Sequence, residues 1–167
     1  MINTNDIPLA LSYDDVLLVP QYSTVSSRND ISLSTKISPR ITLEIPLISA
    51  NMSDVTDAKM AIALAKLGGL GVIPRFLPVE TQADEVNKVK KENVLVGAAV
   101  GSRNGIVERA EALVNAGVDI LFIDVAHGHM QKNIEATIKL KGMFGKKVDI
   151  VSGNAATFDA ADDLFKA

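Results

Sequence analysis

Short apolar runs alternate with amphipathic stretches along most of the chain. Apolar runs typical of strands buried on both faces occur at residues 46–50, 70–73, 94–100, 119–124 and 147–152. Each is followed by a stretch with apolar residues at helical spacing, at 56–67, 79–91, 106–116, 130–143 and 158–166. Gly68 and Gly117 follow two of these stretches, where glycine commonly ends a helix. The pattern predicts five strand–helix units.

Strands that recur about every 25 residues, each with a helix after it, predict a parallel sheet joined by right-handed crossovers. This periodicity fits an open doubly wound sheet and also part of an eight-stranded barrel. No Gly-x-Gly-x-x-Gly motif follows the first strand, which weakens the open dinucleotide-binding alternative. Residues 1–45 break the pattern and predict two extended segments, 13–20 and 30–35, joined by a serine-rich turn. We interpret 1–45 as a leader covering one end of the sheet, and 46–167 as the barrel part.

Composition narrows the class of protein. Hydrophobic residues make up 47% and charged residues 22%, the balance of a soluble globular protein. A net charge of −3 gives no reason to expect binding to nucleic acid or to an anionic membrane. The N-terminus lacks the pattern of a secretory signal and no apolar run could span a bilayer, so a cytoplasmic protein is expected. The absence of cysteine excludes disulfides, thiolate metal sites and thiol nucleophiles within these residues.

Polar or glycine-containing segments follow the predicted strands, at the ends where parallel sheets bind ligands. They occupy residues 49–54, 74–76, 101–104, 124–129 and 152–154. Each could instead be ordinary loop chemistry: Ser53, Asp54 and Thr56 are good helix N-caps, and asparagines commonly bond loop backbone.

Asp124 is the most informative of these polar residues. It ends a strongly apolar strand, where an unpaired carboxylate is costly, so we expect a ligand hydroxyl or a neighbouring cation beside it. Arg75 could bind a phosphate or carboxylate, or make a surface salt bridge. His127 and His129 lack a second cluster at metal spacing, so no metal site is expected, and a solvated loop or a structural hydrogen bond explains them better.

Several co-linear motifs resemble one family over nearly the whole chain. They are LSYDDVLLVP at 11–20, IPLISANM at 45–52, MAIA at 60–63, GGLGVI at 68–73, GAAVG at 97–101, AGVD at 116–119, DVAHGH at 124–129 and GNAAT at 153–157. In this order and spacing they resemble IMP dehydrogenases and GMP reductases.

The resemblance implies a TIM-type (β/α)8 barrel, of which this chain holds the leader and about the first five units. It implies chemistry at C2 of a purine nucleotide, IMP or GMP, with NAD or NADP and a cysteine on the loop after the sixth strand. Carried over by position, the substrate-binding residues are Ala50, Asn51, Met52 and Asn154. The cofactor-binding residues are Asp124, Ala126 and His127.

The chain also departs from the family pattern. Met52-Ser53-Asp54-Val55 stands where Met-Asp-Thr-Val is usual, and Pro74-Arg75 replaces a histidine followed by a basic residue, which puts the role of that position in doubt. The cysteine loop, potassium-binding segment, later phosphate loops and flap are expected beyond Ala167, so these residues alone are predicted to be inactive.

Other features leave the branch of the family open. Residues 90–93 run directly into the third strand, leaving no room for the CBS modules common in IMP dehydrogenases. That absence favours GMP reductase, whereas LSYDD at 11–15 and GGLG at 68–71 favour bacterial IMP dehydrogenase. By resemblance we expect a homotetramer. The alternative is a non-catalytic partial barrel that serves as an assembly or binding module.

Overall fold

The computed structural model describes residues 9–167, and the chain divides into two compact units, 1–32 and 33–167. The first unit contains two 3-10 turns, η2 (Tyr13–Asp15) and η3 (Arg28–Asp30). The extended structure predicted for 13–20 is therefore wrong at its start, because the backbone N–H and hydroxyl of Ser12 both donate to Asp15 and close a turn. Residues 1–8, the start of the predicted leader, lie outside the described residues. The prediction that no signal sequence is present there is therefore not tested.

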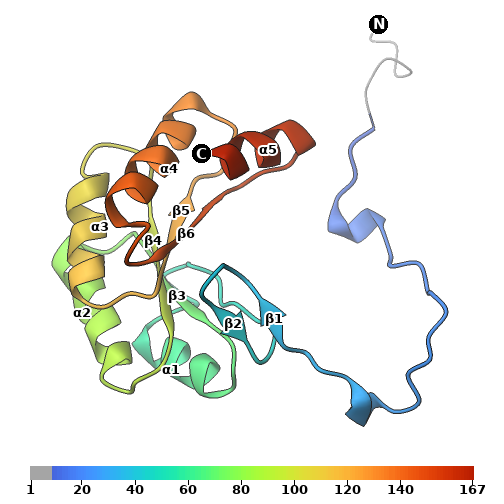
Figure 1. The fold of residues 1–167 in the computed structure, drawn as a ribbon. Coiled ribbons are helices and arrows are strands. Elements are labelled where there is room, and N and C mark those ends of the chain that lie inside the picture. The colour runs from blue at the N-terminus through green and yellow to red at the C-terminus, as the bar shows by residue number, and fades with distance from the viewer. Residues whose placement is uncertain (1–8) are drawn as a thin grey trace, which may run out of the picture. The chain divides into compact units, whose positions relative to one another are not determined.

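Four parallel strands form the sheet of the second unit (Figure 1). They are β3 (Gly71–Ile73), β4 (Val96–Val100), β5 (Ile120–Asp124) and β6 (Asp149–Gly153), and their order in space is their order in the chain. The strand predicted at 46–50 contributes only one parallel bridge, between Ile48 and Leu70. Leu47 and Ile48 are 57% and 44% exposed, so this apolar run lies at an edge and lacks the burial of a central strand.

Five helices follow the predicted pattern within a few residues. They are α1 (Ala58–Lys66), α2 (Val79–Lys90), α3 (Ile106–Asn115), α4 (Gln131–Phe144) and α5 (Phe158–Lys166). The N-cap of α1 is Asp57, whose carboxylate accepts a hydrogen bond from the Met60 N–H at 2.9 Å. The capping role considered for Ser53, Asp54 and Thr56 is therefore wrong, because the helix begins after them.

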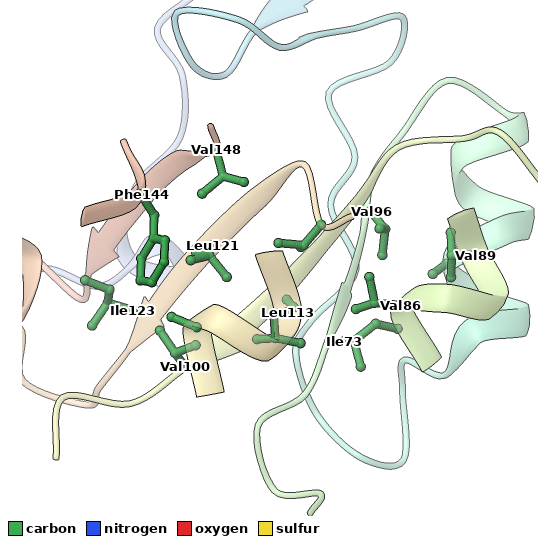
Figure 2. Packing of buried hydrophobic residues seen from close by; sticks show 14 of the residues in the cluster. Ile73, Val86, Val89, Val96, Val100, Leu113, Leu121, Ile123, Phe144 and Val148 are labelled. Carbon is green, nitrogen blue, oxygen red and sulfur yellow. The ribbon is translucent and has the colours of Figure 1, made fainter. Parts of the chain in front are cut away.

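Alternate strand residues face the helices and build the main core (Figure 2). Ile73, Leu121 and Ile123 are buried here against side chains from α2, α3 and α4. Helix and strand pack closest at β3, because a Cβ on Gly71 would lie 2.3 Å from the Ala61 Cα of α1. Only glycine at residue 71 lets α1 approach β3 so closely.

The opposite face of the sheet is covered by a small antiparallel hairpin, β1 (Thr35–Lys36) and β2 (Thr42–Leu43). Ile41 and Leu43 pack there against Leu70, Val72 and other side chains of the strands. The hairpin falls inside the predicted leader, yet it belongs to the compact unit that begins at Leu33. The boundary at residues 45 and 46 stays a prediction.

This arrangement bears on the fold class. A doubly wound sheet carries helices on both faces, whereas α1 to α4 contact one face here and the hairpin covers the other. The predicted α/β class with a parallel sheet and alternating strands and helices is confirmed, and the strand order is consistent with part of a TIM-type barrel. The closed barrel stays a prediction. No helix within residues 9–167 is long and apolar enough to cross a bilayer.

Candidate functional site

A cavity of about 770 Å³ lies at the carboxyl ends of β3, β4 and β5. Its wall is made by the loops that follow these strands, with Val79 of α2 and Arg109 of α3. The loop residues that line it are Arg75, Phe76, Gly101, Ser102, Arg103, Asn104, Gly105, Val125, Ala126, His127 and Met130, and Ile106 lines it at the start of α3. The volume is within the range of small-molecule sites, about 300–1,000 Å³.

Asp124 and Arg75 form an ion pair at this edge of the sheet. The Nε of Arg75 lies 3.6 Å from Oδ2 of Asp124, and each side chain is about one-third exposed. The distance is too long for a hydrogen bond, and Nε is buried without a hydrogen-bond partner among residues 9–167. The guanidinium also lies over the Phe76 ring, 4.3 Å from its centroid. The cation expected beside Asp124 is therefore Arg75, and both retain capacity for further hydrogen bonds.

The loops after β5 and β6 are joined through their backbones. The Asn154 N–H donates to the Val125 carbonyl at 2.9 Å, and the Gly128 N–H donates to the Asn154 carbonyl at 2.8 Å. A Cβ on Gly128 would lie 2.5 Å from that carbonyl oxygen, so glycine is required for the approach. The fully buried Asn133 supports both loops, since its Nδ2 donates to the Gly128 carbonyl and to Ser152 Oγ. Ala126 and Asn154 are thus carried by one connected unit.

The two histidines of this region differ in their surroundings. His127 lines the cavity and is exposed. His129 lies 2.9 Å from Asp163 Oδ2 through its Nε2, a contact that joins the loop to α5. No group of three metal-ligating acidic, histidine or cysteine side chains occurs within the described range, 9–167.

Gln82 and Arg109 support the cavity, and sequence reasoning missed both. Gln82 is fully buried, and its Nε2 donates to the carbonyls of Ile73 and Ala99, at the ends of β3 and β4. Arg109 donates to Gln82 Oε1 at 2.6 Å and to the Leu77 carbonyl at 3.0 Å. Burial lowers the pKa of the Arg109 guanidinium below its usual value, and the positive charge of Arg75 lowers it further.

A sequence signal for this network did exist. Gln82 shares the buried stripe of α2 with Val86 and Val89, and a polar side chain at such a position needs partners. Arg109 likewise lies one turn from the buried Leu113 of α3.

The other predicted substrate-binding residues lie on the loop after Ile48. The buried Thr56 anchors this loop, since its hydroxyl donates to the Ala50 carbonyl at 2.5 Å and lies 2.8 Å from Ser49 Oγ. Asn51 is half-buried and Met52 is 59% exposed. Ala50, Asn51 and Met52 are not part of the cavity wall described above. Their roles in substrate binding, like that of Asn154, stay predictions.

Comparison with known proteins gives a consistent result. The family described as the IMP dehydrogenase / GMP reductase domain matches residues 10–167. An inosine-5'-monophosphate dehydrogenase of Cryptosporidium parvum is 33% identical over 99% of this chain and 51% of its own length. One of Borreliella burgdorferi is 35% identical over 93% of this chain and 50% of its length.

A GMP reductase of Leishmania major is 25% identical over 96% of this chain and 60% of its length. The chain therefore spans about half the length of the curated relatives it matches, and up to three-fifths of some.

Proposed function

Because the chain belongs to the IMP dehydrogenase / GMP reductase family, we propose that the protein is a purine nucleotide oxidoreductase that acts at C2 of the base with a nicotinamide cofactor. Relatives carry the names of both activities, so IMP and GMP are both candidate substrates. One observation carries the proposal: Ala126 and His127, assigned to the cofactor by resemblance, line one cavity, and Asp124 ends the strand that leads into it.

The residues around the cavity fit a dinucleotide. The Asp124 carboxylate is partly exposed and not hydrogen-bonded by Arg75, so its oxygens are available to the hydroxyls of a ribose. Ala126 has a small side chain, which leaves room beside that carboxylate. A nicotinamide cofactor, when bound, supplies or accepts the hydride. The task of these residues is to bind and orient the ribose, and NAD and NADP are both candidates.

The substrate-binding residues proposed by resemblance follow the two outer segments of the same edge. Ala50, Asn51 and Met52 come after the bridge at Ile48, and Asn154 comes after β6. We place the purine nucleotide against them. No cysteine occurs in the 167 residues, so the thiol that the resemblance implies is not among them. We therefore expect these residues alone to bind cofactor without turnover. The potassium ion, the tetramer and the cytoplasmic location also stay predictions.

Two measurements test the proposal. The protein expressed from its native gene is assayed with IMP plus NAD and with GMP plus NADPH, following the reduced nicotinamide. Consumption of one pair supports the proposal and identifies the substrate, and consumption of neither refutes it in favour of a non-catalytic module.

The second measurement is calorimetric titration of this chain with NAD and NADP. Asp124→Asn should weaken binding about tenfold, as expected for loss of hydrogen bonds to a charged group. Asp162→Asn on α5 is the matched control, because Asp162 pairs only with Lys166 among the residues 9–167. Equal affinities for wild type and Asp124→Asn would remove the assigned role of Asp124.

A further inference from the structure

The cavity described above carries an excess of positive charge. Arg75, Arg103 and Arg109 line it together with His127. Among the described residues, 9–167, no aspartate or glutamate lines it. Asp124 stands beside it and offsets one arginine, Arg75. Like charges gathered around one cavity repel each other, and together they attract an anion.

The three arginines differ in how far their donors are already used. Arg109 is fixed by hydrogen bonds to Leu77 and Gln82, so its role is to support the wall. Arg75 has an ion pair with Asp124 but no hydrogen bond within 9–167; its Nε is buried, whereas the side chain as a whole is about one-third exposed, so the terminal N–H groups are the donors it offers. Arg103 is exposed and has no hydrogen bond or ion pair within 9–167. Arg75 and Arg103 are therefore the two arginines with donors to offer a ligand.

The chemistry of these donors selects the kind of anion. A guanidinium presents parallel N–H groups in a planar fork that matches the oxygens of a phosphate. The loop that carries Arg103 runs along the cavity into α3, whose N-cap Gly105 provides no side-chain cap. The first amides of α3 add further donors to the same wall. The arginines carry the argument, and the helix end agrees with them.

We propose that Arg75 and Arg103 form a phosphate-binding site in this cavity, which takes a phosphoryl group of the dinucleotide. The proposal rests on the function proposed above, in which Asp124 binds a ribose of the same ligand. Two phosphoryl sources share this chemistry: the pyrophosphate, which NAD and NADP both contain, and the 2′-phosphate, which only NADP contains. Arg103 would in the second case determine the choice of cofactor.

The experiment is calorimetric titration of this chain with NAD, NADP and inorganic pyrophosphate, on wild type, Arg103→Ala and Arg75→Lys. Arg103→Ala should weaken binding of at least one dinucleotide about tenfold, the effect of one charge-assisted hydrogen bond. Arg75→Lys keeps the charge and loses the fork, and a weakening there supports bidentate binding. Lys91→Ala is the control for net charge, since Lys91 is exposed at the end of α2 and outside the cavity.

The outcomes separate the ideas. Equal loss for NAD and NADP assigns the pyrophosphate, and loss for NADP alone assigns the 2′-phosphate. A third outcome is that the dinucleotides bind, that Asp124→Asn weakens their binding, and that both arginine variants bind them as tightly as wild type does. This outcome refutes the phosphate site and leaves the proposed function standing. If pyrophosphate binds through Arg103 and neither dinucleotide binds, the anion site stands and the cofactor assignment fails. Absence of binding by all three probes overturns the phosphate site. An unchanged melting temperature confirms that Arg103→Ala folds.

Discussion

The ion pair between Asp149 and Arg40 should be the most important polar contact holding the hairpin to the sheet. Asp149 is 7% exposed at the start of β6, and its Oδ1 receives the Arg40 Nε at 2.7 Å. Its Oδ2 accepts from Ser38 Oγ at 2.5 Å and from the Arg40 N–H at 3.2 Å. Arg40 also donates to the carbonyls of Gly145 and Lys146. The substitution Asp149→Asn keeps the shape, removes the charge and places an amide where two donors converge.

The size of the effect follows from these contacts. Hydrogen bonds to a charged group contribute about 1.5–3 kcal/mol each, and breaking a fully buried pair costs about 3–5 kcal/mol. The Arg40 side chain is 42% exposed and regains water when its partner is lost, which reduces the cost. We therefore expect Asp149→Asn to lower the free energy of unfolding by about 2–3 kcal/mol near neutral pH.

The effect should depend on pH in a defined direction. Burial of the Asp149 carboxyl raises its pKa, but the hydrogen bonds from Arg40 and Ser38 outweigh burial, so the pKa lies below its usual value. A lowered pKa in the folded state means that the stabilisation is complete above the unfolded value of about 3.9, and is lost as pH falls through the lower folded value. The difference between wild type and Asp149→Asn should be constant from about pH 7 to about pH 5 and shrink below about pH 4.

Urea unfolding followed by far-ultraviolet circular dichroism measures these free energies, since the chain has no tryptophan to report by fluorescence. Asp162→Asn is the matched control, because its pair with Lys166 on α5 is exposed to solvent and should contribute little to stability. A difference for Asp149→Asn below about 0.5 kcal/mol at neutral pH, or one that persists undiminished to about pH 3, would refute the reasoning.

Three further predictions concern the packing beneath the site. Gln82→Leu removes the partner of two strand carbonyls and of Arg109, and urea unfolding should show a loss of about 2–4 kcal/mol; wild-type stability would contradict the network. Gly71→Ala should destabilise the folded protein by about 1–3 kcal/mol or more, because the added methyl group overlaps α1. Gly142→Ala, with open space around it in α4, should stabilise the folded protein by about 0.5–1 kcal/mol. A higher melting temperature for Gly71→Ala than for Gly142→Ala would refute the packing described. Asn133→Ala should lower the free energy of unfolding by about 1–3 kcal/mol and speed amide hydrogen exchange at Gly128 and Asn154. Asn87→Ala, at an exposed residue of α2, is the control. Unchanged exchange in Asn133→Ala would mean that Asn133 does not hold the two loops.

Local sequence patterns determined much of this protein. The helices follow from apolar residues at a spacing of three and four, and their bounds agree with the prediction because each helix depends mainly on neighbours along the chain. Asp124 at the end of an apolar strand indicated a ligand hydroxyl or a nearby cation, because an unpaired carboxylate is costly there, and the structure supplies the cation, Arg75. Gln82 carried the same kind of signal, a polar side chain on a buried stripe, although its partners could not be read from it.

Only the tertiary structure decided which distant residues meet. The run at 46–50 has the apolar pattern of a strand, but a strand needs a partner along its length, and only Ile48 is bridged. Arg40 and Asp149 are 109 residues apart, and nothing local to either predicts their contact. Arg75 follows β3, whereas Arg103 and Arg109 follow β4, and the three share one cavity because parallel strands end at the same edge. Apolar residues that repeat every second position in a strand, or every 3.6 positions in a helix, indicate which face of that element is buried. Which segment packs against that face depends on the register and packing of segments far apart in the chain.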